Sequence, residues 1–340
     1  MEKKDFDLLT FGEIMLRLSP PWHERITQGE SFEKYPGGAE LNVAAGVALL
    51  GLRTGIISRL PQTDLGTYIK NRVRFLGVSD DYLLYDGSPE ARLGLYYYEM
   101  GAAPRKPSVV YDRKESSVTR VTLEEIPQEV YGAARMFHTS GISLALCPQM
   151  RAVAIELIRR FKEAGAMISF DVNYRANLWT EEEARTCIQG ILPLVDVLFV
   201  SEETSRRMFQ KTGELKDILK SYAAQYGVKV VAATQRTVVN PRKHEFTSVV
   251  YDSAADRYYS EAPYRDIEVI DRVGSGDAYV AGVLYGLLQT GDTETAMRYG
   301  NAASSLKNTV LGDLPASDRK EVERTIRNHN ATGYVSEMNR

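Results

Sequence analysis

The chain has 340 residues, of which 44% are hydrophobic and 26% charged, a composition that excludes a disordered or fibrous protein. Its formal net charge of −3 gives no overall reason to expect nucleic acid or an acidic membrane as a partner. Cys147 and Cys187 form no CxxC pair, so we expect reduced thiols. The N-terminal stretch MEKKDFDLLTFG is too short in apolar residues for a signal or membrane-spanning segment, and we expect a cytoplasmic protein.

Short apolar runs rich in β-branched residues alternate along the chain with amphipathic stretches of helical length, a pattern typical of βαβ units around a parallel sheet. Strands are predicted at 7–11, 55–58, 135–139, 166–171, 195–200 and 229–233. Helices are predicted at 39–50, 65–76, 148–164, 181–192, 202–211 and 216–226, with three more in the last third. No long linker divides the chain, so we expect a single doubly wound α/β domain over residues 1–340.

Two segments, at about 16–36 and 91–120, interrupt this alternation, and both are predicted to form antiparallel strands. The alternating aromatic residues of GLYYYEM and VVYD suit a sheet with one covered face. We interpret the two segments as a small β lid over one edge of the α/β body; the alternative is an extra hairpin with no role in binding. A lid with an apolar face also favours a homodimer.

The stretch GSGDA, residues 274–278, stands directly before a long apolar run. Gly274 and Gly276 allow positive φ, which leaves backbone N–H groups free to bind an anion at a helix N-terminus. Asp277 is typical of an ordinary helix N-cap, and a general base beside an anion site is the alternative. An anion site with a carboxylate beside it is suited to phosphoryl transfer.

A second glycine pair, Gly37 and Gly38, opens the segment PGGAELNVA before a predicted helix, and Asn42 is its conspicuous polar residue. Such pairs permit close backbone approach but are structural more often than ligand-binding.

A third segment, SFDVNYRANLW, places Asp171, Asn173 and Arg175 after an apolar strand. Open α/β sheets bind ligands at this end of their strands, and arginine suits a carboxylate or a phosphate. The alternative is a surface loop with a local ion pair.

Several catalytic and cofactor motifs are missing from the sequence. GxGxxG and GxxxxGK[ST] are both absent, which disfavours an oxidoreductase and a Walker loop. The four histidines form no HExxH motif and there is no GxSxG, so neither a zinc site nor a serine hydrolase is expected.

Taken together, PGGAELNVA and DRVGSGDAYVAG resemble the two signatures of the ribokinase-like (PfkB) sugar kinase family, over essentially residues 6–328. The resemblance implies a doubly wound, mostly parallel sheet flanked by helices with a small β lid. It also implies ATP and Mg²⁺ as co-substrate, with activation by a monovalent cation left open. Asp277 then corresponds to the catalytic base, and Gly274, Ser275 and Gly276 to the anion hole.

Within that family the chain most resembles the 2-keto-3-deoxygluconate kinases, through FGEIMLRLSP, RLGLYYYE and FDVNYRANLW among other pieces. The implied activity is ATP-dependent phosphorylation of the terminal hydroxyl of 2-keto-3-deoxygluconate. The resemblance implies that Arg17, Arg113 and Arg175 balance a substrate carboxylate. Arg17 stands where neutral-sugar kinases of the family carry an aspartate. The implied substrate-binding residues are Arg17, Gly37, Gly38, Asn42, Tyr96, Tyr111, Arg113, Ile142, Asp171, Arg175 and Asp277.

The expected nucleotide side departs from the family in two places. The usual Asn-x-x-Glu reads Ser201-Glu202-Glu203-Thr204, so Glu202 or Glu203 is expected to organise Mg²⁺ through water. The glycine-containing turn expected after Thr234 reads QRTVVNPRKHEF, which we interpret as a subfamily-specific loop at 235–246. The implied ATP-binding residues are Ser201, Thr234, Gln235, Arg236, Gly274, Gly276 and Asn301.

Two other functions stay open on the sequence alone. One is a related kinase for 5-dehydro-2-deoxygluconate, fructose, ribose or a nucleoside. The other is a sugar-binding regulator without catalysis, which the altered 201–204 motif leaves open. A small-molecule substrate is expected in each case, with no nucleic-acid or membrane partner.

Overall fold

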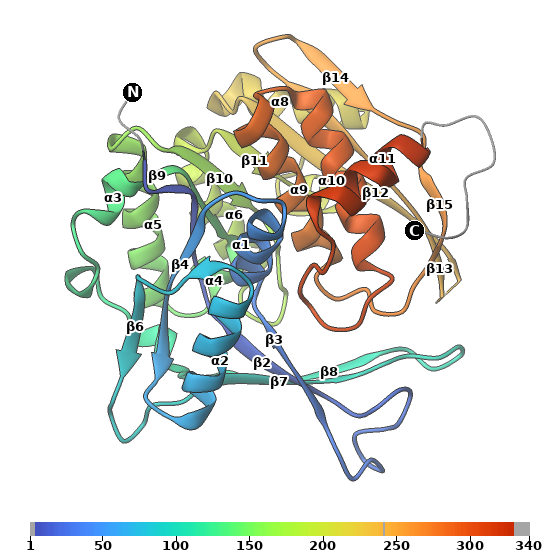
Figure 1. Cartoon of the computed structure of the whole chain (residues 1–340). Helices are drawn as coiled ribbons and strands as arrows, with labels where there is room; N and C mark the ends of the chain where they lie inside the picture. The colour runs from blue at the N-terminus through green and yellow to red at the C-terminus, as the bar shows by residue number, and fades with distance from the viewer. Residues whose placement is uncertain (1–3, 241, 330–340) are drawn as a thin grey trace.

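The computed structural model describes residues 4–240 and 242–329, and within them eleven strands form one large sheet (Figure 1). Its strands are β1 (Phe6–Phe11), β4 (Thr54–Pro61), β5 (Val78–Ser79), β6 (Leu83–Asp86), β9 (Ala134–Ser140), β10 (Met167–Asp171), β11 (Val197–Phe199), β12 (Val230–Asn240), β13 (Lys243–Asp252), β14 (Arg257–Ser260) and β15 (Tyr264–Glu268). The main path runs β14-β13-β12-β11-β10-β9-β1-β4-β5, with β15 beside β13 and β6 beside β4. All pairings from β12 to β5 along this path are parallel, and those of β13 are antiparallel.

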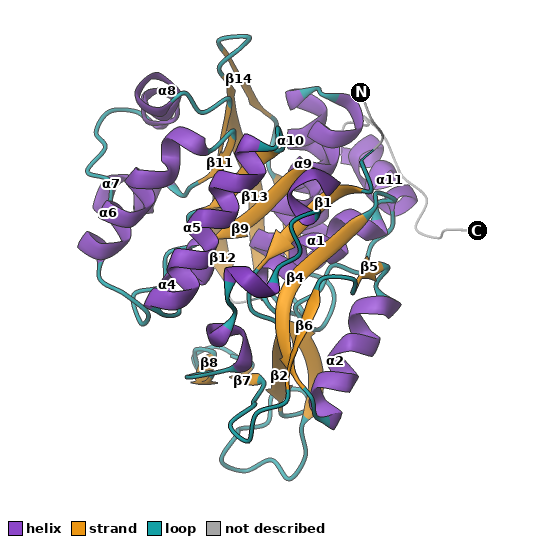
Figure 2. Ribbon diagram, turned by 90° about the vertical axis from the view of Figure 1, so that its left-hand side faces the viewer, coloured by secondary structure: helices purple, strands orange, loops and turns teal. Residues whose placement is uncertain are grey.

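Helices cover both faces of this sheet (Figure 2). They are α1 (Ala39–Leu49), α2 (Asp64–Phe75), α3 (Val130–Ala133), α4 (Gly141–Ala145), α5 (Pro148–Glu163), α6 (Glu181–Ile191), α7 (Glu202–Arg207), α8 (Leu215–Tyr226), α9 (Ser275–Thr290), α10 (Thr293–Lys307) and α11 (Arg319–His329). Successive side chains of a strand point to opposite faces. Leu9 of β1 accordingly packs in the core beneath α5, α6 and α8, and Leu8 in the core beneath α1, α9 and α10.

Helix α9 lies in the interior because it is apolar on nearly every side, and glycines allow its neighbouring helices to pack closely against it. A Cβ placed on Gly46 of α1 would lie 2.6 Å from the Cβ of Ala281. A Cβ placed on Gly282 of α9 would lie 2.5 Å from the carbonyl oxygen of Tyr299 in α10. Glycine at these contacts therefore lets three helices pack closely, which fixes the position of the α9 N-terminus.

The two segments that interrupt the α/β alternation form a separate four-stranded sheet, called the small sheet below (Figure 1). Its strands are β2 (Met15–Ser19), β3 (Glu33–Gly37), β7 (Gly94–Glu99) and β8 (Ser108–Asp112), in the order β3-β2-β7-β8. The pairs β2-β3 and β7-β8 are antiparallel as expected, but β2 and β7 pair in parallel. Every residue of β8 is exposed, whereas Tyr96 and Tyr98 of β7 are buried.

The predicted strands and helices are confirmed, with ends shifted by a few residues, apart from two places. The predicted helix 202–211 ends at Arg207, and Gln210 takes a left-handed φ of 55°. The prediction of a loop at 235–246 is wrong, because in this stretch strand β12 pairs with strand β13 as a hairpin. The Asn240 side chain accepts from the N–H of Arg242 at 2.9 Å.

Three observations concern the described residues as a set. No helix among them is long and apolar enough to cross a bilayer. Cys147 and Cys187 are both free thiols, as expected from their spacing. No group of three His, Cys, Asp or Glu side chains in residues 4–240 and 242–329 is arranged to hold a metal ion.

Candidate active site

The N-terminus of α9 presents free backbone amides. Gly274 precedes the helix with φ 80°, and a Cβ there would lie 1.8 Å from the carbonyl oxygen of Asp313. Across the described residues, the amides of Gly276 and Asp277 have no hydrogen-bond acceptor. A Cβ on Gly276 would meet no atom within 4 Å, so open space lies beside these amides. Free amides at a helix N-terminus form an anion site.

Asp277 joins the two glycine motifs of the sequence. Its Oδ2 accepts a hydrogen bond from Nδ2 of Asn42 at 2.7 Å, although 235 residues separate the two in the chain. Asn42 is buried in α1, and its Oδ1 has no partner among the described residues. Burial raises the pKa of Asp277 to about 6, against the opposing effects of the Asn42 hydrogen bond and of Arg175. A carboxyl group with this pKa is ionised at neutral pH and basic enough to accept a proton.

Asp171 and Arg175 lie at the same edge of the sheet, after β10. In the sheet register Asp171 aligns with Ser140 of β9 and Phe199 of β11, so the carboxyl ends of these parallel strands meet here. Burial, and then the charge of Asp277, raises the pKa of Asp171 to about 7. Arg175 is exposed and has no carboxylate at ion-pair distance among the described residues.

Arg113 and Tyr111, two of the residues predicted to bind substrate, belong to the small sheet and the turn that follows it. Nε of Arg113 donates to Oε2 of Glu13 at 2.8 Å, and its Nη2 contacts the same oxygen. Glu13 is buried in the turn between β1 and β2 and also accepts from the hydroxyl of Ser116. The Tyr111 ring is half exposed and lies 5.7 Å from that of Tyr96. Arg113 is thus held in place with its charge already balanced.

The guanidinium group of Arg17, expected to face the substrate, is already bound by two carboxylates. It is fully buried, and its Nη1 lies 2.6 Å from Oδ2 of Asp271 and 3.1 Å from Oδ1 of Asp313. The hydroxyl of Tyr96 donates to the other oxygen of Asp313. A Cβ on Gly37 would lie 2.4 Å from that same oxygen. Arg17 therefore ties strand β2 of the small sheet to the segments on both sides of the α9 N-terminus.

Contacts with neighbouring residues restrict the positions of Gly38 and Ile142. Gly38 has φ 125°, and a Cβ there would lie 2.2 Å from the carbonyl oxygen of Glu13. Ile142 is the second residue of α4, and its N–H donates to the Ser140 hydroxyl at 3.2 Å. The same hydroxyl donates to Oε1 of Glu40 at 2.7 Å. Glu40 is buried in the first turn of α1, with a pKa raised by burial.

The other residues predicted to bind nucleotide lie at three different elements, namely α7, β12 and α10. The Ser201 hydroxyl accepts from the N–H of Thr204 at 3.0 Å and so caps α7. Thr234, Gln235 and Arg236 are residues of strand β12 rather than of a loop. Asn301 is fully buried, where it accepts from the Ser248 hydroxyl and donates to Glu261, both at 2.8 Å.

The two glutamates predicted to organise Mg²⁺ lie on the exposed face of α7. Glu202 contacts Arg206 at 2.6 Å, and Glu203 contacts Arg207 at 2.8 Å. Each carboxylate therefore already has a cation one helical turn away, and neither is joined to Asp277 by a contact in the described residues.

Sequence reasoning missed several buried charged residues around the site. They are Glu13, Glu40, Asp271, Lys307 and Asp313. Glu13 and Glu40 lie within the quoted motifs but resemble ordinary solvent-exposed glutamates in sequence. Their partners lie about 100 residues away, so no local signal could have identified them.

The fold and the site together define a class of α/β protein in which a helix N-terminus with free amides, suited to an anion, lies beside a buried carboxylate. The model of the pfkB family of carbohydrate kinases matches residues 5–318, and the chain belongs to that family. It is 36% identical over 325 residues to a 2-dehydro-3-deoxygalactonokinase of Haloferax volcanii, covering 96% of this chain and 98% of the relative.

Two solved structures are similar to this chain. A 2-dehydro-3-deoxygluconokinase of Thermotoga maritima superposes with a TM-score of 0.90 at 34% identity, covering 96% of this chain and all of that one. A more distant neighbour is a candidate ribokinase II from E. coli in complex with ATP and Mg²⁺. It has 21% identity and a TM-score of 0.82, and the match covers 95% of this chain and 100% of that one, so it supports the fold alone.

Proposed function

We propose that this carbohydrate kinase phosphorylates 2-keto-3-deoxygluconate at its terminal hydroxyl, with MgATP as phosphoryl donor, giving the 6-phosphate and ADP. The observation that carries the proposal is the position of Asp277, a raised-pKa carboxylate on a helix whose first amides have no acceptor. The similarity to a 2-dehydro-3-deoxygalactonokinase and a 2-dehydro-3-deoxygluconokinase supports a sugar acid as substrate.

In the proposed reaction, Asp277 accepts the proton of the attacking hydroxyl as the bond to phosphorus forms. The amides of Gly276 and Asp277 hold the transferring phosphoryl group, which bears most of the negative charge in the transition state. The N–H of Ser275, expected in the anion hole, already donates to the carbonyl oxygen of Arg272 at 3.2 Å. ADP leaves on the opposite side of phosphorus. The small sheet acts as a lid that excludes water, within a single kinase domain spanning the chain.

The cation that faces the substrate carboxylate is Arg175 in this proposal. It is exposed at the sheet edge and lacks a carboxylate partner among the described residues, and its charge reaches Asp171 and Asp277. Arg113 keeps a secondary role through its Nη1, because Glu13 binds its other two nitrogens. Arg17 supports the site indirectly, since its guanidinium is used by Asp271 and Asp313.

Mg²⁺ enters as part of the nucleotide in this proposal. The described residues hold no group of three potential ligands for a resident ion, which fits a metal bound mainly through ATP phosphates. Ser201, Thr234 to Arg236 and Asn301 remain the proposed nucleotide side of the site. Glu202 or Glu203 would act on the metal through water after releasing its arginine.

The assembly and location follow from the same proposal. The exposed strand β8 carries Val109, Val110 and Tyr111 on an open sheet edge, which favours a homodimer formed through the small sheet. A kinase that consumes ATP and an intermediate of sugar metabolism belongs in the cytoplasm.

The epimeric acid 2-dehydro-3-deoxygalactonate is the second candidate substrate, because the 36% identical relative is named for it. The two acids differ in the configuration of one hydroxyl and share the carboxylate that Arg175 would bind.

The decisive experiment is an ADP-release assay with MgATP and a substrate panel. The panel contains both 3-deoxy acids, 5-dehydro-2-deoxygluconate, fructose, ribose and a nucleoside. We expect the highest kcat/KM for one of the two 3-deoxy acids. Faster turnover of fructose than of every acid would refute the carboxylate argument, and absence of ADP release with all of them would favour a sugar-binding regulator.

A further inference from the structure

Lys307, the last residue of α10, carries a buried ammonium group that the proposed reaction does not use. The residue is 1% exposed. Its Nζ lies 3.2 Å from the carbonyl oxygen of Asp271 and 3.2 Å from that of Val310. Among the described residues no carboxylate lies at ion-pair distance from it. Burying an ammonium group without a direct counter-ion costs several kcal/mol, so a buried lysine of this kind needs a structural explanation.

The two carbonyl oxygens belong to the two segments that border the α9 N-terminus. Asp271 precedes the glycine turn, and its Oδ1 accepts from the N–H of Val273 at 3.0 Å. Its Oδ2 accepts from the N–H of Gly312 at 3.1 Å, which connects the first segment to the second. The carbonyl oxygen of Asp313 then lies directly against Gly274. Lys307 therefore bridges the two segments at the point where they support the anion site.

The electrostatic surroundings of Lys307 suit a monovalent cation. Burial lowers the pKa of the ammonium group and Arg17 lowers it further, while the carboxylates of Asp271 and Asp313, which lie beyond contact distance, oppose this and stabilise the charge. Arg17 and Lys307 contribute two positive charges, and Asp271 and Asp313 contribute two negative ones. Backbone carbonyl oxygens are also the groups that replace water around a dehydrated K⁺ ion.

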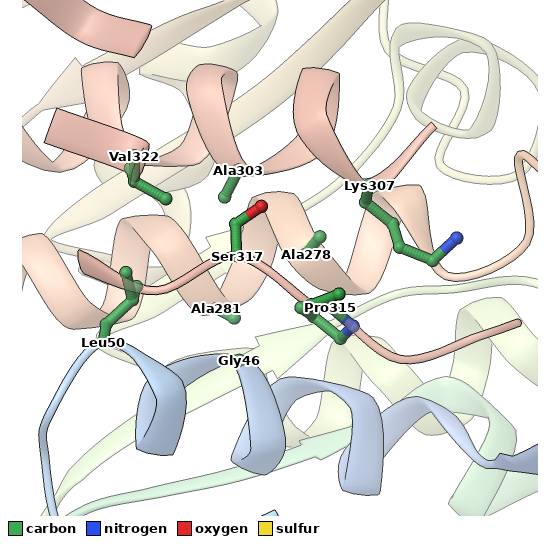
Figure 3. Close-up of a pocket in the computed structure, with 10 residues that line it drawn as sticks. Gly46, Leu50, Ala278, Ala281, Ala303, Lys307, Pro315, Ser317 and Val322 are labelled. Carbon is green, nitrogen blue, oxygen red and sulfur yellow. The ribbon is translucent and has the colours of Figure 1, made fainter. Parts of the chain in front are cut away.

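A role for Lys307 in ligand binding at its own position does not fit the geometry. Its methylene stem borders a small cavity between α1, α9 and α10, which Gly46, Ala278 and Ala281 help to line (Figure 3). The cavity holds about 10 Å³, no more than a single water molecule. Figure 3 shows the Lys307 nitrogen directed away from this cavity.

We propose that Lys307 is a positioning residue that acts as a tethered monovalent cation, holding segments 271–274 and 310–313 together so that the amides of Gly276 and Asp277 stay directed at the phosphoryl group. The enzyme is then independent of added monovalent metal ions. This inference rests on the proposed phosphoryl site at the α9 N-terminus. It predicts that removing the side chain leaves a site for NH₄⁺ or K⁺, formed by two carbonyl oxygens with two carboxylates nearby.

The test is cation rescue of Lys307→Ala. Steady-state kinetics are measured with MgATP and the preferred sugar, first with tetramethylammonium chloride as the only monovalent salt, and then with NH₄Cl, KCl or NaCl at the same ionic strength. We expect the kcat of the wild type to change less than twofold. In Lys307→Ala we expect kcat to fall about 100-fold, with a small effect on the KM for the sugar, because a displacement of about 1 Å has this effect on transfer. Saturating NH₄⁺ or K⁺ should then raise the kcat of Lys307→Ala at least tenfold.

Lys162→Ala is the matched control. The ammonium group of Lys162 contacts Asp196 at 2.7 Å, before the start of β11 and thus at the opposite end of the sheet from Asp277. This variant also loses a partly buried lysine, so it reports general destabilisation. We expect its kcat to stay near wild type and to be indifferent to the cation.

A second readout does not depend on catalysis. At constant ionic strength, K⁺ or NH₄⁺ should raise the thermal unfolding temperature of Lys307→Ala above its value in tetramethylammonium, and should leave that of the wild type unchanged. If Lys307→Ala does not fold, Lys307→Gln replaces it: the neutral amide fills the space, so we expect a reduced kcat that no cation restores.

Three results would overturn the inference. They are activation of the wild type by K⁺, a normal kcat of Lys307→Ala in tetramethylammonium, and a folded, inactive Lys307→Ala that no cation stabilises or restores. Failure of the proposed function is recognised separately, since an inactive wild type leaves the unfolding measurement intact.

Discussion

The side-chain amide of Asn42 donates a hydrogen bond of 2.7 Å to Oδ2 of Asp277, so the first glycine motif orients the carboxylate of the second. Helix α1 carries the donor and helix α9 the acceptor, and the small residues between them keep the two helices close. Among the described residues no group donates to Oδ1 of Asp277. That oxygen is therefore the one available to accept the substrate proton.

Replacing Asp277 with Asn should remove the base while keeping the shape of the site. We expect kcat to fall by about 10²–10⁴-fold, the usual contribution of a general base, with sugar and nucleotide affinity changed only a few-fold. Single-turnover transfer and calorimetric titration measure the two quantities. Near-normal turnover would show that Asp277 is not the base; it is not a helix cap either, because Gly274 is the N-cap of α9 and no side chain caps this helix.

The same variant should be more stable than the wild type at high pH. The pKa of Asp277 in the folded protein is about 6, above its ordinary value of 3.8, so the folded state binds this proton more tightly than the unfolded chain does. Asp277 thus contributes stability below about pH 3.8, and this contribution is lost as pH rises through about 6. At pH 8, Asp277→Asn should therefore unfold at a higher temperature than the wild type; an equal or lower temperature would contradict the raised pKa.

The activity of the wild type should rise with pH as Asp277 ionises, with the acid limb of kcat/KM near pH 6. The Asn42 hydrogen bond lowers this pKa, so Asn42→Ala should move the limb to higher pH. A hydrogen bond to a charged group contributes about 1.5–3 kcal/mol, so kcat/KM at pH 6 should fall about tenfold or more. Profiles between pH 5 and 9 test this, and an unshifted limb in Asn42→Ala would count against the role of this bond.

Gly276 and Gly274 provide a matched pair for the anion site. A Cβ on Gly276 meets nothing within 4 Å, so Gly276→Ala should fold with normal stability. If a phosphoryl group occupies that space, the methyl group should reduce kcat/KM for ATP on the order of 10²-fold through misplacement. Gly274→Ala should instead destabilise the fold, because φ is 80° and the Cβ would collide with Asp313. Full activity of Gly276→Ala would place the phosphoryl group elsewhere.

Arg175 should determine the preference for acidic substrates. Arg175→Lys keeps the charge but loses the planar pair of donors, and we expect the KM for the 3-deoxy acid to rise about tenfold. The KM for a neutral sugar should change little. Arg113→Lys is the comparison, since Glu13 already balances that charge. A larger effect at Arg113 than at Arg175 would assign the substrate carboxylate to Arg113.

The alternation of strands and helices could be predicted from the sequence because it depends on local periodicity and on glycines at helix ends. The β12–β13 hairpin could not, since its polar stretch from Gln235 to Asn240 is exposed and becomes a strand only through its pairing with β13. The parallel pairing of β2 with β7 could not be predicted from the sequence either, because it joins segments about 80 residues apart.

The amino-acid sequence by itself determined the two glycine motifs, the position of Asp277 at a helix start and the resemblance to sugar kinases, because each depends on residues close together in the chain. Only the tertiary structure decided which charged residues remain free for a ligand. Arg17 and Arg113 are already neutralised by carboxylates distant in sequence, Arg175 is not, and Lys307 is buried against two carbonyl oxygens. The physical reason is that the electrostatic role of a side chain depends on its partners and its burial, and folding brings those together from distant parts of the chain.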